Sequence, residues 1–600
     1  MKKQSAQFKQ LKKAHQQKKL NKKQFVGDSV KNDLDLTAAR KLVSPCLYDD
    51  PLVPLSKIIE HHQANILSKI GLHPRLGNCS LFFSYCSGEQ KAKQLNITSS
   101  TPEEAWMSLL TTLEKKEDKK LSQVFVRWLR LDWIVESNEH TFVELNADIR
   151  ASTNGFYTKG ISLDPSFEYA LLESELNANG ILYTGSVDKG HWQSDLNELK
   201  LKTYVQKKFG NKSPVKFTDS TLFYTFKTCG CFISSNTFYE IRDGGRYRNI
   251  KQLDEKNLKY VISASRRFLT SQIQPNGRFV YGIVPQGNRT FTGYNAMRHV
   301  GAVYSLLDAW AGEEEKVSKQ SIDLAIQYAI NKLTLSLNMN GKKLTFLVDG
   351  DEIKAGGIGL CLLMLVKYTE LTDDLRYAEV MEQLAEAILF IQQPDGSFTH
   401  VLDASTLEVK QAYRTIYYDG EATFGLMRYY QLNKEQRWLD ANIKAFNYFC
   451  EKNHWKAHDH WLAYALNEIT KYVQDDRYFE LGLKNVFKHL NFILERETYY
   501  PTLGELVMAS YQLIKRIEAI PEKQHLLETY DMDKFHRALE YRMHYLLEGF
   551  YWPEIAMFFD TPFRIVGSFY LRHHEMRTRI DDVQHYLSGY VAYKRYYKNT

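Results

Sequence analysis

The sequence has no hydrophobic run long enough to cross a membrane. A transmembrane helix needs about 20 predominantly apolar residues, and no stretch of about 18 occurs in the chain. The lysine-rich start is not followed by the apolar segment of about 7 to 15 residues that a secretory signal contains. We therefore expect a cytoplasmic protein without a transmembrane segment.

Cysteine is scarce in this sequence. The seven cysteines are odd in number and scattered, which argues against the disulfide framework of a small secreted domain. Cys229 and Cys231 form the one close pair, but a single intervening residue matches neither the usual zinc knuckle nor a redox CxxC motif. The spacing favours the interior of a strand, and we expect no metal site.

Glycine-rich phosphate-binding motifs are absent as well. The sequence contains neither a P-loop nor a GxGxxG pattern followed by an acidic residue. A nucleotide-driven mechanism therefore has no support, and we expect a protein that needs no cofactor.

Positive charge is concentrated at the start of the chain. Residues 1–33 contain ten lysines and two aspartates, a net charge of +8, so the other 567 residues carry −1 of the formal total of +7. By bulk charge, the folded body is not a polyanion-binding protein. Residues 1–44 predict a disordered basic tail, which is either simply solvated or contacts a polyanion, an anionic membrane surface or a partner protein.

The rest of the chain changes character near residue 250. Residues 45–250 mix strand patterns, at 80–85 and 124–133, with a helical pattern at 165–176, which predicts an α+β domain. Residues 251–600 predict an all-α domain of twelve helices. The expected helices span 255–272, 294–311, 317–335, 356–371, 376–392, 417–432, 435–452, 459–473, 477–495, 502–518, 533–549 and 579–597.

The twelve helices alternate in character. The even-numbered helices carry small residues that let a neighbouring helix approach closely, whereas the odd-numbered helices carry charge on one face, as an outer layer does. Most long connections lead into the even-numbered helices, so the long loops gather on the face where these helices begin. We expect a ring of six helical hairpins whose even-numbered helices open into one cavity.

Two long loops contain a similar turn, Pro275–Phe279 and Pro394–Phe398, and two even-numbered helices begin with aromatic and acidic residues, at 417–421 and 459–468. With these features and six hairpins, residues 255–600 resemble the six-hairpin glycosidase-like (α/α)6-toroid superfamily. That superfamily includes N-acylglucosamine and cellobiose epimerases, uronyl hydrolases and the C-terminal domain of glucuronyl C5-epimerases. The resemblance implies a toroid that acts on carbohydrate, but it assigns no catalytic residue.

The expected cavity combines acidic, aromatic, histidine and arginine side chains from nearly every even-numbered helix. Sugar binding needs this mixture, because aromatic faces stack on pyranose rings, carboxylates accept hydrogen bonds from hydroxyls, and arginine binds a uronate, phosphate or sulfate. The candidate catalytic residues are Asp419, Glu421, Asp459, His299, His460 and Asp582. The candidate substrate-binding residues are Tyr294, Asn295, Arg298, Tyr417, Tyr418, Trp461, Tyr464, Glu505, Arg577, Arg579 and His585.

These residues leave the reaction open. Acids at helix starts have the alternative role of capping the helix. Paired carboxylates suit glycoside hydrolysis, whereas a histidine with Tyr417 suits proton removal beside a carbonyl or uronate, as in epimerisation or elimination. We predict an enzyme of polysaccharide metabolism that acts on an anionic sugar or glycan by one of these reactions. The alternatives are a non-catalytic glycan-binding or assembly module in envelope polysaccharide production, and a toroidal cyclase or protein-modifying enzyme.

Overall fold

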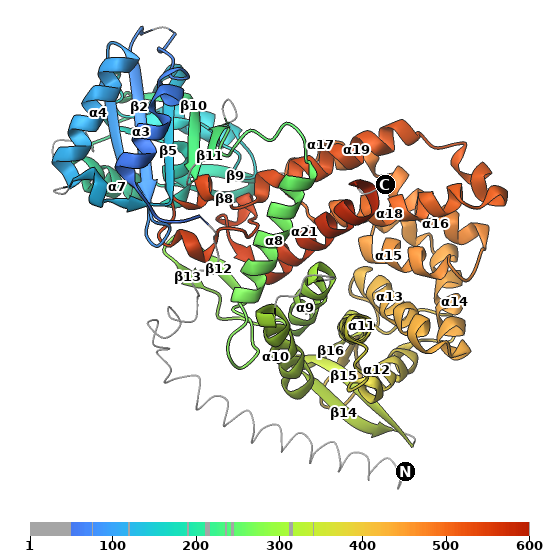
Figure 1. The fold of residues 1–600 in the computed structure, drawn as a ribbon. Helices are drawn as coiled ribbons and strands as arrows, with labels where there is room; N and C mark the ends of the chain where they lie inside the picture. Colours follow the sequence, from blue (N-terminus) through green and yellow to red (C-terminus); the bar gives the residue numbers. More distant parts are fainter. Residues whose placement is uncertain are drawn as a thin grey trace.

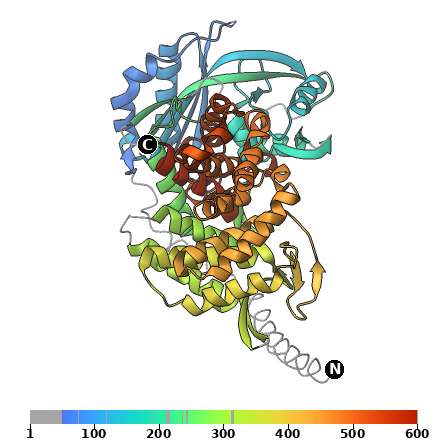
Figure 2. The same cartoon turned by 90° about the vertical axis from the view of Figure 1, so that its right-hand side faces the viewer.

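The structure is a computed structural model that describes residues 50–598 except 75, 118–119, 189–190, 211–215, 235–236, 242–244, 311–315 and 340. The predicted basic tail, residues 1–44, lies outside the described residues. Figures 1 and 2 show a sheet-rich N-terminal region packed against a larger helical region. This is the order of α+β and all-α parts that the sequence predicts.

The N-terminal region is built on a seven-stranded sheet in the order β3-β2-β5-β10-β6-β7, with β11 also paired to β10. The long strands β5 (Trp128–Thr141) and β10 (Leu222–Ser234) are antiparallel neighbours at its centre. Cys229 and Cys231 lie inside β10, as their spacing predicted. The other strands are β2 (Cys79–Cys86), β3 (Lys93–Ser99), β6 (Gly160–Ser162), β7 (Ala170–Leu171) and β11 (Thr237–Ile241).

Alternate side chains of β2 pack into different cores. Leu81 and Phe83 join a cluster with the helices α3 (Leu55–Leu67) and α4 (Pro102–Glu117), whereas Phe82 joins the large core of the helical region. Because successive side chains of a strand point to opposite faces, the sheet has α3 and α4 on one face and the helical region on the other. The two regions therefore share a continuous hydrophobic contact.

The inner layer of the helical region is a closed ring of six helices. The helices α9, α11, α13, α15, α18 and α21 contact one another in this order, and α21 contacts α9. These are the even-numbered helices of the sequence prediction, so the region has the (α/α)6-toroid architecture. They span Ala296–Trp310, Ala355–Thr372, Tyr417–Asn433, His460–Ile469, Thr502–Glu518 and Ile580–Tyr593.

The outer layer contains the odd-numbered helices of the prediction. One of them, predicted over 477–495, is broken into two helices, and the short strands between outer and inner helices were not predicted. At 334–339 the apolar residues alternate, which is the strand period, so the helix predicted to 335 ends at Lys332. The outer helices are α8 (Glu255–Ser271), α10 (Lys316–Lys332), α12 (Ala378–Ile391), α14 (Gln436–Glu451), α16 (Asp476–Phe487) with α17 (Leu490–Glu495), and α19 (Met532–Tyr545).

Two small sheets lie in the loops between outer and inner helices. One has the order β14-β15-β16-β17-β18 and the other β13-β12-β19. They lie on the side of the ring where the inner helices begin, because β16 leads directly into α11 and β19 directly into α21. The strands are β12 (Gly282–Val284), β13 (Arg289–Thr290), β14 (Thr334–Met339), β15 (Lys342–Asp349), β16 (Glu352–Lys354), β17 (Val401–Asp403), β18 (Val409–Gln411) and β19 (Thr578–Arg579).

Glycine allows α11 and α13 to pack backbone against backbone. A Cβ atom on Gly359 would lie 2.3 Å from the carbonyl oxygen of Glu421, and one on Gly425 would lie 2.4 Å from the carbonyl oxygen of Gly359. Both distances are too short for a side chain. In the described part of the chain, α11 is also the one helix long and apolar enough to cross a membrane. Its place in the inner ring, between α9 and α13, accounts for that apolar composition.

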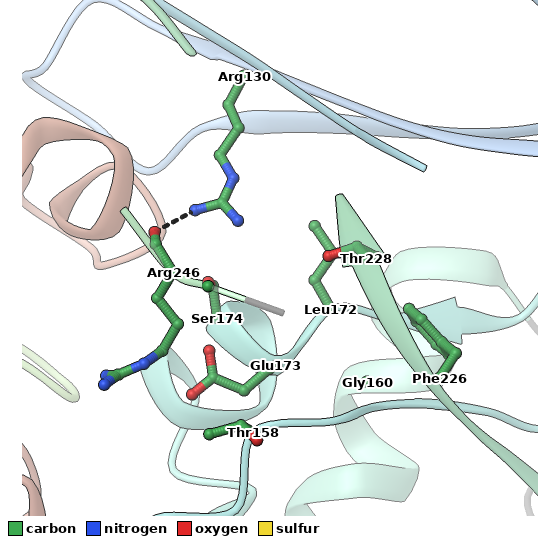
Figure 3. A pocket seen from close by; sticks show the side chains of 10 residues that line it. Arg130, Thr158, Gly160, Leu172, Glu173, Ser174, Phe226, Thr228 and Arg246 are labelled. Atoms are coloured by element: carbon green, nitrogen blue, oxygen red, sulfur yellow. Dashed lines mark hydrogen bonds between the residues drawn. The ribbon is translucent and has the colours of Figure 1, made fainter. Parts of the chain in front are cut away.

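Buried arginines join the two regions. Glu554, on the short helix α20 (Pro553–Ala556) of the helical region, is fully buried and accepts from Nε and Nη2 of Arg248, each at 2.8 Å. Arg130 of β5 donates to the carbonyl oxygens of Arg246, at 2.8 Å, and of Glu554, at 2.9 Å. Figure 3 shows the pocket beside these contacts, with Arg130, Arg246 and Glu173 in its wall.

The buried pair of Arg248 and Glu554 predicts a large stability effect. The substitution Glu554→Gln leaves the Arg248 guanidinium buried beside a neutral amide, which we expect to lower the free energy of unfolding by about 3–5 kcal/mol. The matched control is Glu379→Gln, which removes an exposed partner of Lys343 and should change stability by less than about 1 kcal/mol. Urea unfolding followed by tryptophan fluorescence measures both, and equal small effects would contradict the prediction.

Candidate active site at the mouth of the helical ring

The first turns of neighbouring inner helices meet at one end of the ring. Oε2 of Glu505, on α18, lies near His585 of α21 and His460 of α15. Arg298 of α9 forms an ion pair with Asp581 of α21. These contacts link residues near the starts of four inner helices, α9, α15, α18 and α21.

A carboxylate between two imidazoles forms the centre of the site. Oε2 of Glu505 lies 2.6 Å from Nδ1 of His585 and 3.6 Å from Nε2 of His460. The two imidazole rings meet edge to face, with centroids 5.2 Å apart. Glu505 is 1% exposed and His460 is 4% exposed, so water does not compete strongly for these groups.

The hydrogen bond with Glu505 fixes the tautomer of the His585 imidazole. Glu505 accepts the hydrogen bond from Nδ1, which fixes the tautomer whose Nε2 carries a lone pair. In the part of the chain that the structure describes, no protein group forms a hydrogen bond with Nε2, and His585 is partly exposed. His585 is therefore oriented to accept a proton from a molecule in the cavity.

The same three residues include the donor atoms that a transition metal prefers. One nitrogen or oxygen atom from each of His460, Glu505 and His585 lies within 4.8 Å of the others, and imidazole and carboxylate ligands suit zinc or iron. The direct hydrogen bond between Glu505 and His585 uses Nδ1 of His585, and Nε2 of His460 is buried without a hydrogen bond to any described residue. The three residues are thus suited either to proton transfer or to holding a metal ion.

Glu421, on the first turn of α13, is a buried carboxyl group without a partner. It is 6% exposed, and its Oε2 forms no hydrogen bond with any described residue. Burial first, and then the negative charge of Asp459, raise its pKa well above the usual value, although Arg298 opposes this shift. This raised pKa favours the protonated carboxyl, which can donate a hydrogen bond to an oxygen atom.

The other acids predicted as catalytic residues, Asp459, Asp419 and Asp582, contact groups within the protein. Both carboxylate oxygens of Asp459 cap α15, accepting from the backbone amides of Trp461 at 3.1 Å and Leu462 at 2.9 Å. Oδ1 of Asp419 lies 3.2 Å from Nε2 of His400. Asp582 accepts from Arg579 at 3.0 and 3.1 Å. The contacts of Asp459 correspond to the capping role that the sequence left as an alternative, whereas Asp419 and Asp582 pair with a histidine and an arginine.

His299, a predicted catalytic residue, points away from the Glu505 cluster. It is fully buried between the hydroxyl of Tyr294, at 2.6 Å, and the carbonyl oxygen of Ala325 on the outer helix α10, at 2.8 Å. Burial lowers its pKa to about 4. The side-chain amide of Asn295 donates to Asp349. Tyr294, Asn295 and His299 thus form contacts that pack the start of α9 against its neighbours.

The aromatic residues divide into exposed and buried groups. Tyr417 and Tyr500 are 38% and 39% exposed, and their hydroxyl oxygens lie 3.4 Å apart. Trp461 is buried, with its ring 4.9 Å from that of His460. The Tyr464 hydroxyl lies 3.4 Å from Oε1 of Glu505. Tyr417 and Tyr500 therefore suit a stacking surface for a sugar, whereas Trp461 and Tyr464 position the histidines and Glu505.

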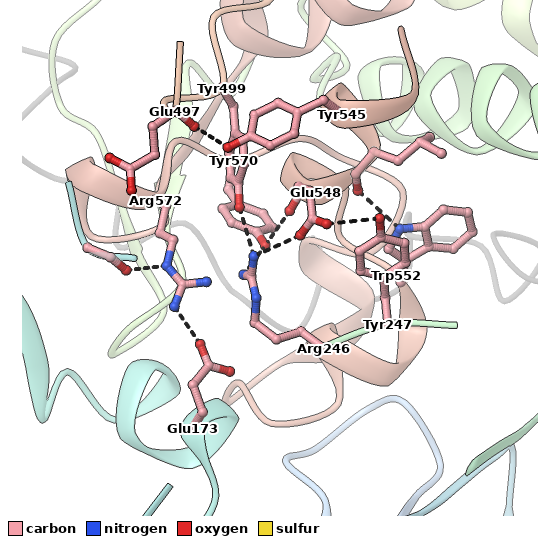
Figure 4. Close-up of polar contacts among 12 residues, drawn as sticks. Glu173, Arg246, Tyr247, Glu497, Tyr499, Tyr545, Glu548, Trp552, Tyr570 and Arg572 are labelled. Carbon is pink, nitrogen blue, oxygen red and sulfur yellow. Dashed lines mark hydrogen bonds and ion pairs between the residues drawn. The ribbon is translucent and has the colours of Figure 1, made fainter. Parts of the chain in front are cut away.

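The N-terminal region holds the chain segments that lead into α18 and α21. Arg246 donates to the hydroxyls of Tyr499, at 2.8 Å, and Tyr570, at 2.9 Å. Arg572 donates to the carbonyl oxygen of Tyr157, at 2.7 Å, and to Glu173, at 2.6 Å. Figure 4 shows the two arginines side by side within this network. Contacts with the N-terminal region thus fix the chain segments that precede α18, which contains Glu505, and α21, which contains His585.

Sequence reasoning missed His400 and Arg246. His400 follows the second of the repeated turns, Pro394–Phe398, and accepts at Nδ1 from the backbone amide of Arg414 while facing Asp419. Its position just after that turn was a usable signal. Arg246 lies in an irregular segment more than 250 residues from Tyr499, and no local pattern connects the two.

Comparison with known proteins gives structural likeness without sequence likeness. No protein-family model matches the sequence, and no curated protein is similar to it at a significant level. Similar solved structures include a D-mannose isomerase (12% identity, TM-score 0.45, 58% of this chain and 98% of that one). A cellobiose 2-epimerase from Bacillus thermoamylovorans has 11% identity and a TM-score of 0.42, covering 56% and 99%. An unsaturated glucuronyl hydrolase specific for heparin has 11% identity and a TM-score of 0.39, covering 57% and 97%.

The buried acid Glu421 predicts a pH-dependent gain in stability on substitution. An unfolded glutamate loses its proton near the ordinary pKa of 4.5, whereas folded Glu421 keeps it to much higher pH. Folding therefore takes up a proton between these values, and stability falls as pH rises. The neutral variant Glu421→Gln removes this loss.

We expect Glu421→Gln to match the parent protein in thermal unfolding at pH 4 and to unfold at a higher temperature at pH 8. The measurement at pH 4 is the internal control for packing changes. If Glu421→Gln unfolded at a lower temperature than the parent protein at pH 8 but not at pH 4, the result would show that Glu421 is ionised in the folded protein.

Proposed function

We propose that the chain is a carbohydrate-active enzyme that moves a proton at a sugar carbon beside a carbonyl group, as aldose–ketose isomerisation and epimerisation require. The observation that carries this proposal is His585, held at Nδ1 by Glu505, with Nε2 free of hydrogen bonds to any described residue. A base with this geometry removes a proton from carbon and leaves an enediolate.

The other groups supply what the enediolate needs. Glu421, whose raised pKa favours the protonated form, donates to the carbonyl oxygen as negative charge develops there. His460 lies beside His585 and close to Glu505, so it is placed to return a proton to the neighbouring carbon or oxygen. Because the rings are only 5.2 Å apart, they act from one side of the sugar, which favours isomerisation over an inversion that needs a base on each face.

Glycoside hydrolysis fits the geometry less well. It needs two carboxyl groups about 5 to 9.5 Å apart, one of them free to act as nucleophile or base. Glu421 meets the requirement for the acid. Its neighbour Asp459 uses both oxygens to cap α15, and Glu505 is bound to His585, so no second free carboxylate faces Glu421 among the residues described.

Exchange of hydrogen with solvent tests the proposal directly. In D2O, we expect the protein to exchange the hydrogen at C2 of at least one sugar in a panel of aldohexoses, ketohexoses and hexuronates, followed by proton NMR. His585→Gln should slow exchange about 100- to 10,000-fold, because it removes the base. Glu505→Gln should act in the same direction, since it frees the imidazole to adopt the wrong tautomer.

The control is His525→Gln, which replaces an exposed histidine in the 3-10 helix Pro521–Leu527, after the C-terminal end of α18 and so at the opposite end of that helix from Glu505. Its exchange rate should equal that of the parent protein. Sugar binding without any exchange would support a non-catalytic binding module instead. Full exchange in His585→Gln would remove this residue from the mechanism.

A further inference from the structure

Three arginines gather where the chain enters α21. Arg579 binds Asp582 at 3.0 Å and Asp581 at 3.1 Å, and Arg298 forms an ion pair with Asp581. Arg577 has no ion pair and no side-chain hydrogen bond with any described residue, and its Nε is buried. Three positive charges thus share two carboxylates, which leaves one positive charge without compensation.

The nearby histidines do not change this balance. Burial first, and then neighbouring positive charges, lower the pKa values of His573 and His574 to about 4 although Asp582 opposes the shift, so both are neutral at pH 7. Burial and then the charge of Arg579 also lower the pKa of Arg577. A guanidinium that is partly desolvated and repelled by its neighbours is stabilised when an anion binds.

The position of Arg577 is fixed by the N-terminal region. Five residues earlier, Arg572 is held by Glu173 and by the carbonyl oxygens of Gly155 and Tyr157. The Thr184 hydroxyl donates to the carbonyl oxygen of His573 at 3.0 Å. The Arg577 guanidinium also packs over the ring of Phe291, 6.0 Å from its centre. An anion that binds here meets a group that is already oriented, so little conformational entropy is lost.

The arginine cluster is connected to α21, the helix that carries His585. Asp582, the partner of Arg579, is three residues before His585 on α21, and residues at this spacing are neighbours on one face, roughly 5–6 Å apart at Cβ. Arg298 acts on both groups, since its charge lowers the pKa of Glu421 and that of Arg577. Asp582 thus connects Arg579 to the face of α21 that carries His585.

We propose that Arg577 binds an anionic substituent, a carboxylate or a phosphate ester, of the sugar that reacts at His585, with Arg579 and Arg298 adding to the positive field. The substrate class is then a hexuronate or a hexose phosphate. This inference rests on the proposed function for the identity of the reacting molecule. The anion-binding site itself does not depend on catalysis.

Calorimetric titration with glucuronate, glucose 6-phosphate and glucose tests the site. We expect the protein to bind one of the two anionic sugars about 10- to 100-fold more tightly than glucose. Tighter binding of glucuronate would indicate a carboxylate site, whereas tighter binding of glucose 6-phosphate would indicate a phosphate site. Arg577→Gln should abolish the preference and leave the affinity for glucose unchanged.

The matched control is Arg289→Gln, which replaces an exposed arginine near the same loop, 3.7 Å from Glu575, and should keep the preference. Because Arg577→Gln removes an unpaired charge, its melting temperature without ligand should equal or exceed that of the parent, which separates a binding effect from misfolding. Equal binding of all three sugars by the parent protein, or an unchanged preference in Arg577→Gln, would overturn the proposal.

The same titrations with His585→Gln distinguish this site from the reaction. A retained preference for the anionic sugar in this variant is expected, because His585 is not part of the arginine cluster. If the parent protein prefers the anionic sugar but exchanges no hydrogen in D2O, the proposed reaction fails and the anion site stands. If exchange occurs on neutral sugars with equal efficiency, the reaction stands and the anion site fails.

Discussion

The close packing of the inner helices is the constraint on which the site depends. At Gly356, Gly359 and Gly425 a Cβ atom would collide with the neighbouring helix, and at Gly356 it would meet Oε2 of Glu421 itself, 1.7 Å away. The missing side chains therefore allow the ring to close and also leave room for a functional carboxyl group. Packing and site geometry are set by the same small residues.

Within that ring, position decides what each acidic residue does. Asp459, Glu421 and Glu505 all lie near the starts of inner helices, yet Asp459 caps a helix, Glu421 has a pKa that burial raises, and Glu505 orients an imidazole. The residue type is similar in each case. The number of backbone amides, charges and histidines within hydrogen-bonding distance makes the difference.

The sequence predicted the layers of the helical region and much less of the site. Helical periodicity and the placement of glycine identified all six inner helices, because both are local properties of the chain. His460, Glu505 and His585 were each singled out, but their association was not, since it depends on how three helices pack. Glu554 and Arg246 were missed because their partners lie about 250 to 300 residues away, and nothing in a local stretch of sequence indicates such a pair.

The contacts of Thr184 and Trp192 bear on how the sequence of such a protein can evolve. Both residues belong to the N-terminal region and contact the segment before α21, at His573 and His574, without contacting His460, Glu505 or His585. Substitutions there change the surroundings of the segment that carries Arg577 and leave the contacts among His460, Glu505 and His585 in place. Under the proposed function, substrate preference could then change through residues of the N-terminal region while selection preserves the residues that carry out the reaction.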